Sequence, residues 1–110
     1  MASSKREILV GTLDMLVLRT LTLGPAHGYA IAQHIERLSD GVFAVEQGSL
    51  YPALERLLKK GWVTARWDET PTKRQGRYYT ITRSGRKQLE EKVSDYNLAA
   101  WAIARVMKRA

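Results

Sequence analysis

The apolar pattern near the end of this chain most limits how it can fold. Between residues 89 and 107, apolar residues recur at spacings of four, three, four, three and four, as in the seam of a coiled coil. These residues are Leu89, Val93, Tyr96, Ala100, Ile103 and Met107. A helix of about 25 residues extends roughly 37 Å, well beyond a small helical core. We therefore expect something outside the protomer to cover the seam, and we predict a homodimer.

The N-terminal part carries a similar excess of apolar side chains. Residues 5–23 are predicted to form a helix, because Gly24 is placed to end it and Pro25 cannot continue it. The segment is apolar nearly all round, so a single packing partner cannot cover it. Two of its faces need burial.

A second helix is predicted over residues 28–38. Ile31, Ile35 and Leu38 lie at i, i+4 and i+7, which places them on its inner side. The helix stops before a polar turn, and residues 42–45 then form an extended linker.

A third helix is predicted from Ser49 to Lys60, with Gly61 at its end. Pro52 would break a helix interior, but the first turn tolerates it because its missing N–H has no helical partner there. The helix is therefore expected to begin near Ser49, which leaves Gln47 and Ser49 at its N-terminal tip.

Two strands are predicted after this helix. Residues 62–67 and 78–82 are rich in β-branched and aromatic side chains, and the polar stretch 68–77 between them is expected to form a long basic hairpin tip. Thr82 is the predicted N-cap of the last helix, which begins at Arg83.

These elements predict a fold that is mainly α with a small β-hairpin. Three helices followed by a hairpin form a winged helix-turn-helix, in which the third helix enters the major groove of DNA and the hairpin is the wing. We expect residues 1–82 to form this DNA-binding domain. Residues 83–110 are expected to form a long C-terminal dimerisation helix within the same structural unit.

The distribution of charge favours a polyanionic partner. The chain has a formal net charge of +7, and residues 56–87 hold ten basic residues against Asp68 and Glu69, a net of +8. The remaining residues hold 8 basic against 9 acidic. Such a concentration of positive charge is the footprint of a nucleic-acid binder, although an anionic membrane surface would attract it too.

Composition argues against several other classes of protein. Without cysteine there is no disulfide framework, thiolate zinc site or cysteine nucleophile, and this composition suits the reducing cytoplasm. His27 and His34 have no third ligand nearby, so no metal site is expected, and His27 is predicted to cap the second helix. No stretch approaches the roughly 18 apolar residues of a membrane span. No cofactor motif or catalytic constellation can be assembled, so an enzyme is not expected.

Five stretches of the chain match one known family in order. They are residues 11–18 (GTLDMLVL), 24–31 (GPAHGYAI), 48–57 (GSLYPALERL), 61–63 (GWV) and 77–85 (RYYTITRSG). Together they resemble PadR-type bacterial transcriptional regulators over about residues 8–96, and the length resembles the subgroup with one C-terminal dimerisation helix. The resemblance implies a dimer whose last helix packs on the partner's first helix. We place Leu9 and Leu13 in this interface with the seam residues.

The tip of the third helix holds the candidate base-reading residues. N-terminal residues of a recognition helix reach base edges or phosphates, which makes Gln47, Ser49 and Tyr51 candidates. The alternatives are Ser49 as an ordinary N-cap and Tyr51 half-buried under the wing. Tyr29, at the start of the second helix, is a candidate phosphate contact.

Basic residues supply the candidate backbone contacts. Arg56 is one, although a cation in the C-terminal half of a helix also offsets the helix dipole. Lys73, Arg74 and Arg77 have a stronger case, because a hairpin tip needs no three cations to fold and their mutual repulsion is unfavourable. The alternative for these three is a solvated loop.

Aromatic residues of the last helix are candidates for an effector site. Tyr96 and Trp101 could stack on a planar ligand at the dimer centre, or they could simply pack there. The resemblance implies such a ligand, because relatives respond to phenolic acids or aromatic drugs, but many members carry Trp where this chain has Tyr96. Trp62 and Trp67 are predicted to pack in the core and the wing.

These observations predict a sequence-specific regulator that binds double-stranded DNA. We expect a repressor that binds a pseudo-palindromic operator as a homodimer and is relieved by a small aromatic effector. The alternative is a basic winged-helix module that binds protein or RNA and has no effector.

Overall fold

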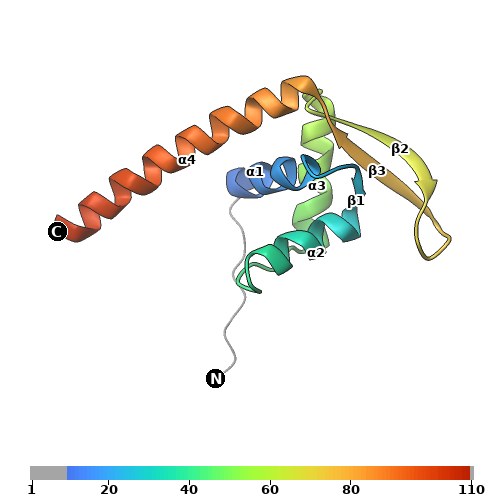
Figure 1. Ribbon diagram of the computed structural model, residues 1–110, viewed down its shortest axis with the longest axis horizontal. Coiled ribbons are helices and arrows are strands. Elements are labelled where there is room, and N and C mark those ends of the chain that lie inside the picture. Colours follow the sequence, from blue (N-terminus) through green and yellow to red (C-terminus); the bar gives the residue numbers. More distant parts are fainter. Residues whose placement is uncertain (1–9, 110) are drawn as a thin grey trace.

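The computed structural model describes residues 10–109 (Figure 1). Its elements in chain order are α1 (Val10–Leu21), β1 (Ala26–His27), α2 (Gly28–Leu38), α3 (Gln47–Lys59), β2 (Val63–Glu69), β3 (Gln75–Ile81) and α4 (Arg83–Arg109). The predicted fold class, mainly α with a small hairpin and a long C-terminal helix, is confirmed. The predicted start of the first helix at residue 5, and the interface role of Leu9, lie outside the described residues.

The core forms where α1, α2 and α3 pack together and against strands β2 and β3. Figure 1 shows α4 and the β2–β3 hairpin leaving this body on opposite sides. Buried apolar residues come from every helix and from the strands: Leu13, Val17, Leu18, Leu21, Ile31, Ile35, Leu50, Ala53, Leu54, Leu57, Val63, Tyr79, Ile81 and Leu89. Leu38 was predicted to point inward and is exposed, because α2 ends there at the edge of the body.

The sheet is antiparallel, with strand order β1-β3-β2. The two-residue β1 was not predicted, because so short a strand has no periodicity of its own and forms by pairing Ala26 with Tyr79 and His27 with Tyr78. The hairpin is longer than expected, since its register runs from Val63–Ile81 to Glu69–Gln75. The tip is therefore residues 70–74 rather than 68–77.

Helix α3 begins two residues earlier than predicted. Its N-cap is Glu46, whose carbonyl oxygen accepts hydrogen bonds from the N–H groups of Ser49 (3.0 Å) and Leu50 (2.9 Å). Ser49 is thus not the N-cap, and Pro52 lies in the second turn. At the other end Gly61 has φ 74°, and Trp62 donates its N–H to the Leu57 carbonyl, so Gly61 ends the helix as predicted.

The start of α4 is fixed against the turn after α3. The Thr82 hydroxyl accepts the Gly85 N–H (3.0 Å) and donates to the Gly61 carbonyl (2.8 Å), so the predicted N-cap is confirmed. Ser84 also donates to the Gly61 carbonyl (3.1 Å). A Cβ at position 85 would overlap the Trp62 carbonyl, so glycine permits this close approach. These contacts set the direction in which α4 leaves the body.

Candidate nucleic-acid interface

The N-terminal tip of α3 is exposed because its apolar side faces the core. Leu50, Leu54 and Leu57 are buried, whereas Gln47 and Ser49 lie on the solvent side. With Glu46 as the N-cap, the Ser49 side chain is left to face solvent. Gln47 and Ser49, two of the three residues predicted to read bases, are therefore accessible.

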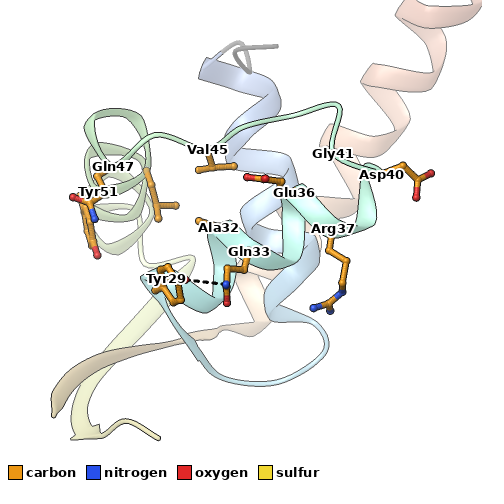
Figure 2. Close-up of a pocket in the computed structure, with 11 residues that line it drawn as sticks. Tyr29, Ala32, Gln33, Glu36, Arg37, Asp40, Gly41, Val45, Gln47 and Tyr51 are labelled. Carbon is orange, nitrogen blue, oxygen red and sulfur yellow. Dashed lines mark hydrogen bonds between the residues drawn. The ribbon is translucent and has the colours of Figure 1, made fainter. Parts of the chain in front are cut away.

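A groove of about 700 Å³ runs between α2 and α3 and brings Tyr29, Gln47 and Tyr51 together along its lining (Figure 2). The Tyr29 hydroxyl accepts a hydrogen bond from Gln33 Nε2 (3.0 Å), the dashed line in Figure 2. Residues from the start of α2 and the start of α3, which are distant in sequence, thus share one surface.

Tyr51 lies between the start of α2 and the wing. A Cβ built at Gly28 would lie 3.0 Å from the Tyr51 hydroxyl, so glycine at this position leaves room for the ring. The ring remains partly exposed and also lines a second hollow, between α3 and the wing. His27 Nδ1 accepts the Ala30 N–H at 3.2 Å, which confirms that His27 caps α2.

Arg77 and Arg56 both have intramolecular partners. Arg77 donates to Glu55 of α3 at 3.1 Å, and its guanidinium lies 5.8 Å from the Tyr79 ring centre. Burial raises the pKa of the Tyr79 phenol, although the nearby Arg77 charge works in the opposite direction. Arg56 binds the buried carboxylate of Asp14 on α1 at 2.9 Å. The DNA contacts predicted for both arginines stay predictions and would compete with these ion pairs.

The wing tip presents Lys73 and Arg74 to solvent. A turn closes between the Lys73 N–H and the Thr70 carbonyl (2.8 Å), and the Thr70 N–H donates to the Arg74 carbonyl (2.7 Å). Lys73 has φ 63°, a conformation that glycine adopts more easily. Within the part of the chain that the structure describes, neither cation forms an ion pair.

Beyond its first turns, α4 is exposed along its length. Val93, Tyr96, Ile103 and Met107 are exposed, and so are apolar residues elsewhere on the helix, such as Leu98 and Val106. Leu13 and Leu89, also predicted for the dimer interface, are only 2% and 6% exposed within the protomer and offer a partner little area. Ala100 is exposed with the rest of the seam.

The structure does not bring Tyr96 and Trp101 into one hollow. Tyr96 lines a depression of about 440 Å³ between α1 and α4, together with Thr12 and Met15, and Trp101 does not. Five residues apart, the two rings project about 140° apart around the helix axis. Trp101 instead lies under the Arg105 guanidinium, 4.9 Å from its ring centre.

The two remaining tryptophans differ in their environments. Trp62 packs against the core and lies 4.6 Å from Lys60 Nζ and 5.4 Å from Lys92 Nζ, in agreement with the packing role predicted for it. Trp67 is 67% exposed, so the prediction that it packs is wrong. It lies on β2 beyond the point where the core ends.

Comparison with known proteins settles the family. Residues 17–91 match the family model described as the transcriptional regulator PadR-like family. The chain belongs to this family. Since its members are regulators, the expectation that the chain is not an enzyme is supported. No helix within residues 10–109 has the length and apolar character needed to cross a membrane, and no three metal-binding side chains cluster there.

Relatives share both sequence and fold with this PadR-like chain. A PadR family transcriptional regulator from Eggerthella lenta is 31% identical, with a TM-score of 0.76 over 91% of this chain and 85% of that one. A transcriptional regulator from Clostridium thermocellum is 28% identical, with a TM-score of 0.80 over 86% and 92%. The negative transcriptional regulator PadR of Bacillus subtilis is 28% identical over 72% of this chain, which spans 43% of that protein.

Membership of a family of transcriptional regulators implies that the chain binds DNA. Three features around α3 and the wing could not be predicted from the sequence: the Asp14–Arg56 pair, the Glu55–Arg77 pair and the exposure of Trp67. The ion pairs join residues 42 and 22 positions apart, and no local pattern signals them.

Proposed function

We propose that this PadR-like regulator is a repressor that binds a pseudo-palindromic duplex as a homodimer. The observation that carries the proposal is that Lys73 and Arg74 at the wing tip form no ion pair within residues 10–109, while the tip of α3 is also exposed. Unpaired cations at a hairpin tip are suited to phosphate contact, while Gln47, Ser49 and Tyr51 are suited to base edges. We assign Tyr29 to a phosphate next to these bases. Arg56 and Arg77 are also assigned to phosphates, which would replace Asp14 and Glu55 as their partners.

The homodimer is proposed from the exposed face of α4. Val93, Tyr96, Ile103 and Met107 form an apolar stripe that the protomer leaves in water, and stable dimers cover such stripes. Residues 83–110 then act as the dimerisation helix and residues 1–82 as the DNA-binding part. A two-fold dimer presents two recognition helices, so the half-sites should be spaced by about 10 bp.

Repression and its relief are finer proposals. The related Bacillus subtilis protein is named a negative transcriptional regulator, which favours repression by this chain. We assign relief to a planar aromatic compound bound near Tyr96 and Trp101, and we place the protein in the cytoplasm, where its DNA lies. Because the two rings diverge on one helix, a shared pocket requires rings from both protomers.

Selection of bound duplexes from a random pool tests the DNA-binding proposal. The expected product is a two-fold motif whose affinity falls steeply with salt concentration. The double variant Lys73→Ala/Arg74→Ala should reduce the slope of log K against log salt by about two per protomer bound. Lys108→Ala, in the last turn of α4, is the matched control and should leave the slope unchanged. Enrichment of no motif, or binding of single-stranded RNA in preference to duplex DNA, would contradict the proposal.

Effector binding is tested separately by tryptophan fluorescence. Aromatic acids and dyes that quench the emission should also lower operator affinity, and Trp101→Phe and Tyr96→Ala should weaken both effects. A panel in which no compound does both would show that the stripe is only a dimer core.

A further inference from the structure

Trp67 is a large apolar side chain that the fold leaves in water. Along β2, Val63 and Ala65 share its side of the strand and turn toward the body, because side chains alternate in a strand. Trp67 is the next residue on that side, and it extends past the end of the core with 67% of its surface exposed. Its indole N–H has no acceptor within residues 10–109.

The surroundings of Trp67 form a hollow of about 390 Å³ between α3 and the wing. Three exposed aromatic residues from three elements line it: Tyr29 of α2, Tyr51 of α3 and Trp67 of β2. We call this the aromatic hollow. Exposed aromatic residues gathered in one place mark a binding surface more often than a packing defect.

Charge around the aromatic hollow indicates what it binds. Arg77 lines the hollow and is paired with Glu55, which lines it too. Beside this ion pair the hollow offers ring faces, the polar side chains of Thr70 and Gln75, and the indole N–H of Trp67. The free cations of the wing tip, Lys73 and Arg74, follow on the same hairpin. An anionic ligand with an apolar part fits this combination, and the sugar-phosphate backbone of DNA has both.

We propose that Trp67 is a DNA-backbone contact, with its ring against a deoxyribose and its indole N–H donating to the adjacent phosphate. One DNA strand would enter the aromatic hollow at the point where its backbone passes from α3 to the wing. This inference rests on the proposed duplex binding. Because the indole carries no charge and reads no base edge, its contribution is independent of salt concentration and of base sequence.

The decisive measurement compares Trp67→Ala with the wild type on the selected operator and on an unrelated duplex of equal length. We expect about tenfold weaker binding to both, with the salt slope unchanged. Lys73→Ala is the contrasting variant, since it should reduce the slope by about one. Trp67→Phe keeps a ring but loses the N–H, so its loss should be intermediate.

Tryptophan fluorescence gives a second test. The double variant Trp62→Phe/Trp101→Phe keeps Trp67 as its single tryptophan. Its emission should change on addition of duplex DNA, whereas a variant that keeps only Trp101 should show little change. If the wild type binds duplex DNA while Trp67→Ala binds equally well and the Trp67 emission stays constant, the inference is wrong and the proposed function stands. A wild type that binds no duplex overturns both. A loss confined to the selected operator would overturn the backbone assignment.

Discussion

Asp14 of α1 turns its carboxylate into the core, where an unpaired charge is unfavourable. Arg56 of α3 meets it at 2.9 Å, and Arg56 Nε is itself buried without a hydrogen-bond partner. The pair therefore joins the helix that supports α4 to the helix proposed to read DNA. Arg66 and Asp68, by contrast, form an exposed pair at 3.6 Å on the wing.

These two pairs give a matched prediction for stability. Asp14→Ala should lower the free energy of unfolding by about 1–3 kcal/mol, because it leaves a partly buried guanidinium uncompensated. Asp68→Ala removes an exposed pair and should change it by less than about 0.5 kcal/mol. Urea denaturation measures both changes. Equal losses of unfolding free energy would show that the Asp14–Arg56 pair stabilises the fold no more than the exposed pair does.

Lys73 combines strain with a proposed function. Its φ of 63° favours glycine, so Lys73→Gly should stabilise the protein by up to about 1 kcal/mol while weakening duplex binding through the lost charge. Arg74→Gly loses the same charge without relieving a positive φ, and it should not stabilise. Thermal unfolding measures the stability of both variants, and DNA titration measures their affinity. If Lys73→Gly and Arg74→Gly have the same stability, the proposed strain at Lys73 is wrong.

Tyr79 makes stability depend on alkaline pH. Its pKa is raised by burial, so the folded pKa lies above the unfolded value of 10.0. The neutral phenol is favoured in the fold, and its contribution is fully present below pH 10.0 and is lost as pH rises through the folded pKa. Tyr79→Phe should therefore lose less stability than the wild type between pH 9 and about 11. The check is the urea midpoint of the wild type and of Tyr79→Phe, measured across this pH range. If the two midpoints change in parallel with pH, Tyr79 is not the group responsible.

At the scale of elements, the turn after α3 controls the direction of α4. Gly61, Thr82 and Ser84 are joined by hydrogen bonds, and Gly85 lies against the Trp62 carbonyl. About two turns further along the same side of α4, Lys92 Nζ lies 5.4 Å from the Trp62 ring centre. The end of α3, the proposed recognition helix, and the start of α4, the proposed dimerisation helix, are therefore fixed to each other through one short segment.

Gly85→Ala should disturb this junction. The added Cβ meets backbone rather than a flexible side chain, so we expect a loss of about 1–3 kcal/mol in unfolding free energy. Gly11→Ala is the control, because nothing lies within 4 Å of the Cβ position there and alanine favours helix. A Gly85→Ala protein as stable as the control variant would show that α4 can shift freely.

At the scale of the whole molecule, the protomer leaves its longest helix largely uncovered. Of the described residues of α4, Gly85 and Leu89 are buried, and both lie near its start. The remaining turns carry enough apolar surface to make an isolated protomer prone to association. The proposed dimer would cover these apolar residues and remove them from water.

Ile103→Asp tests this assembly. A charge in the middle of the stripe should cause dissociation or unfolding at micromolar concentration, as measured by light scattering. Ser94→Asp places the same charge about 180° around the axis of α4 from Ile103 and should leave the assembly intact. A wild type that is a stable folded monomer would contradict the dimer.

The sequence by itself determined the features that depend on neighbouring residues. Gly61 and Thr82 set the limits of helices through local backbone geometry, and the four-three spacing identified a long helix with an uncovered stripe. The family motifs are likewise runs of adjacent residues. Each of these signals is local, so no knowledge of the folded arrangement was needed to read it.

The tertiary structure alone decided which distant residues meet and which remain in water. Pairing with β3 creates β1, and packing of α1 on α3 brings Asp14 to Arg56. Trp67 was predicted to pack in the wing, but the core includes Val63 and Ala65 of β2 and not Trp67, which stays exposed. Burial depends on where the neighbouring element stops, and that position is a property of the whole fold rather than of the residue.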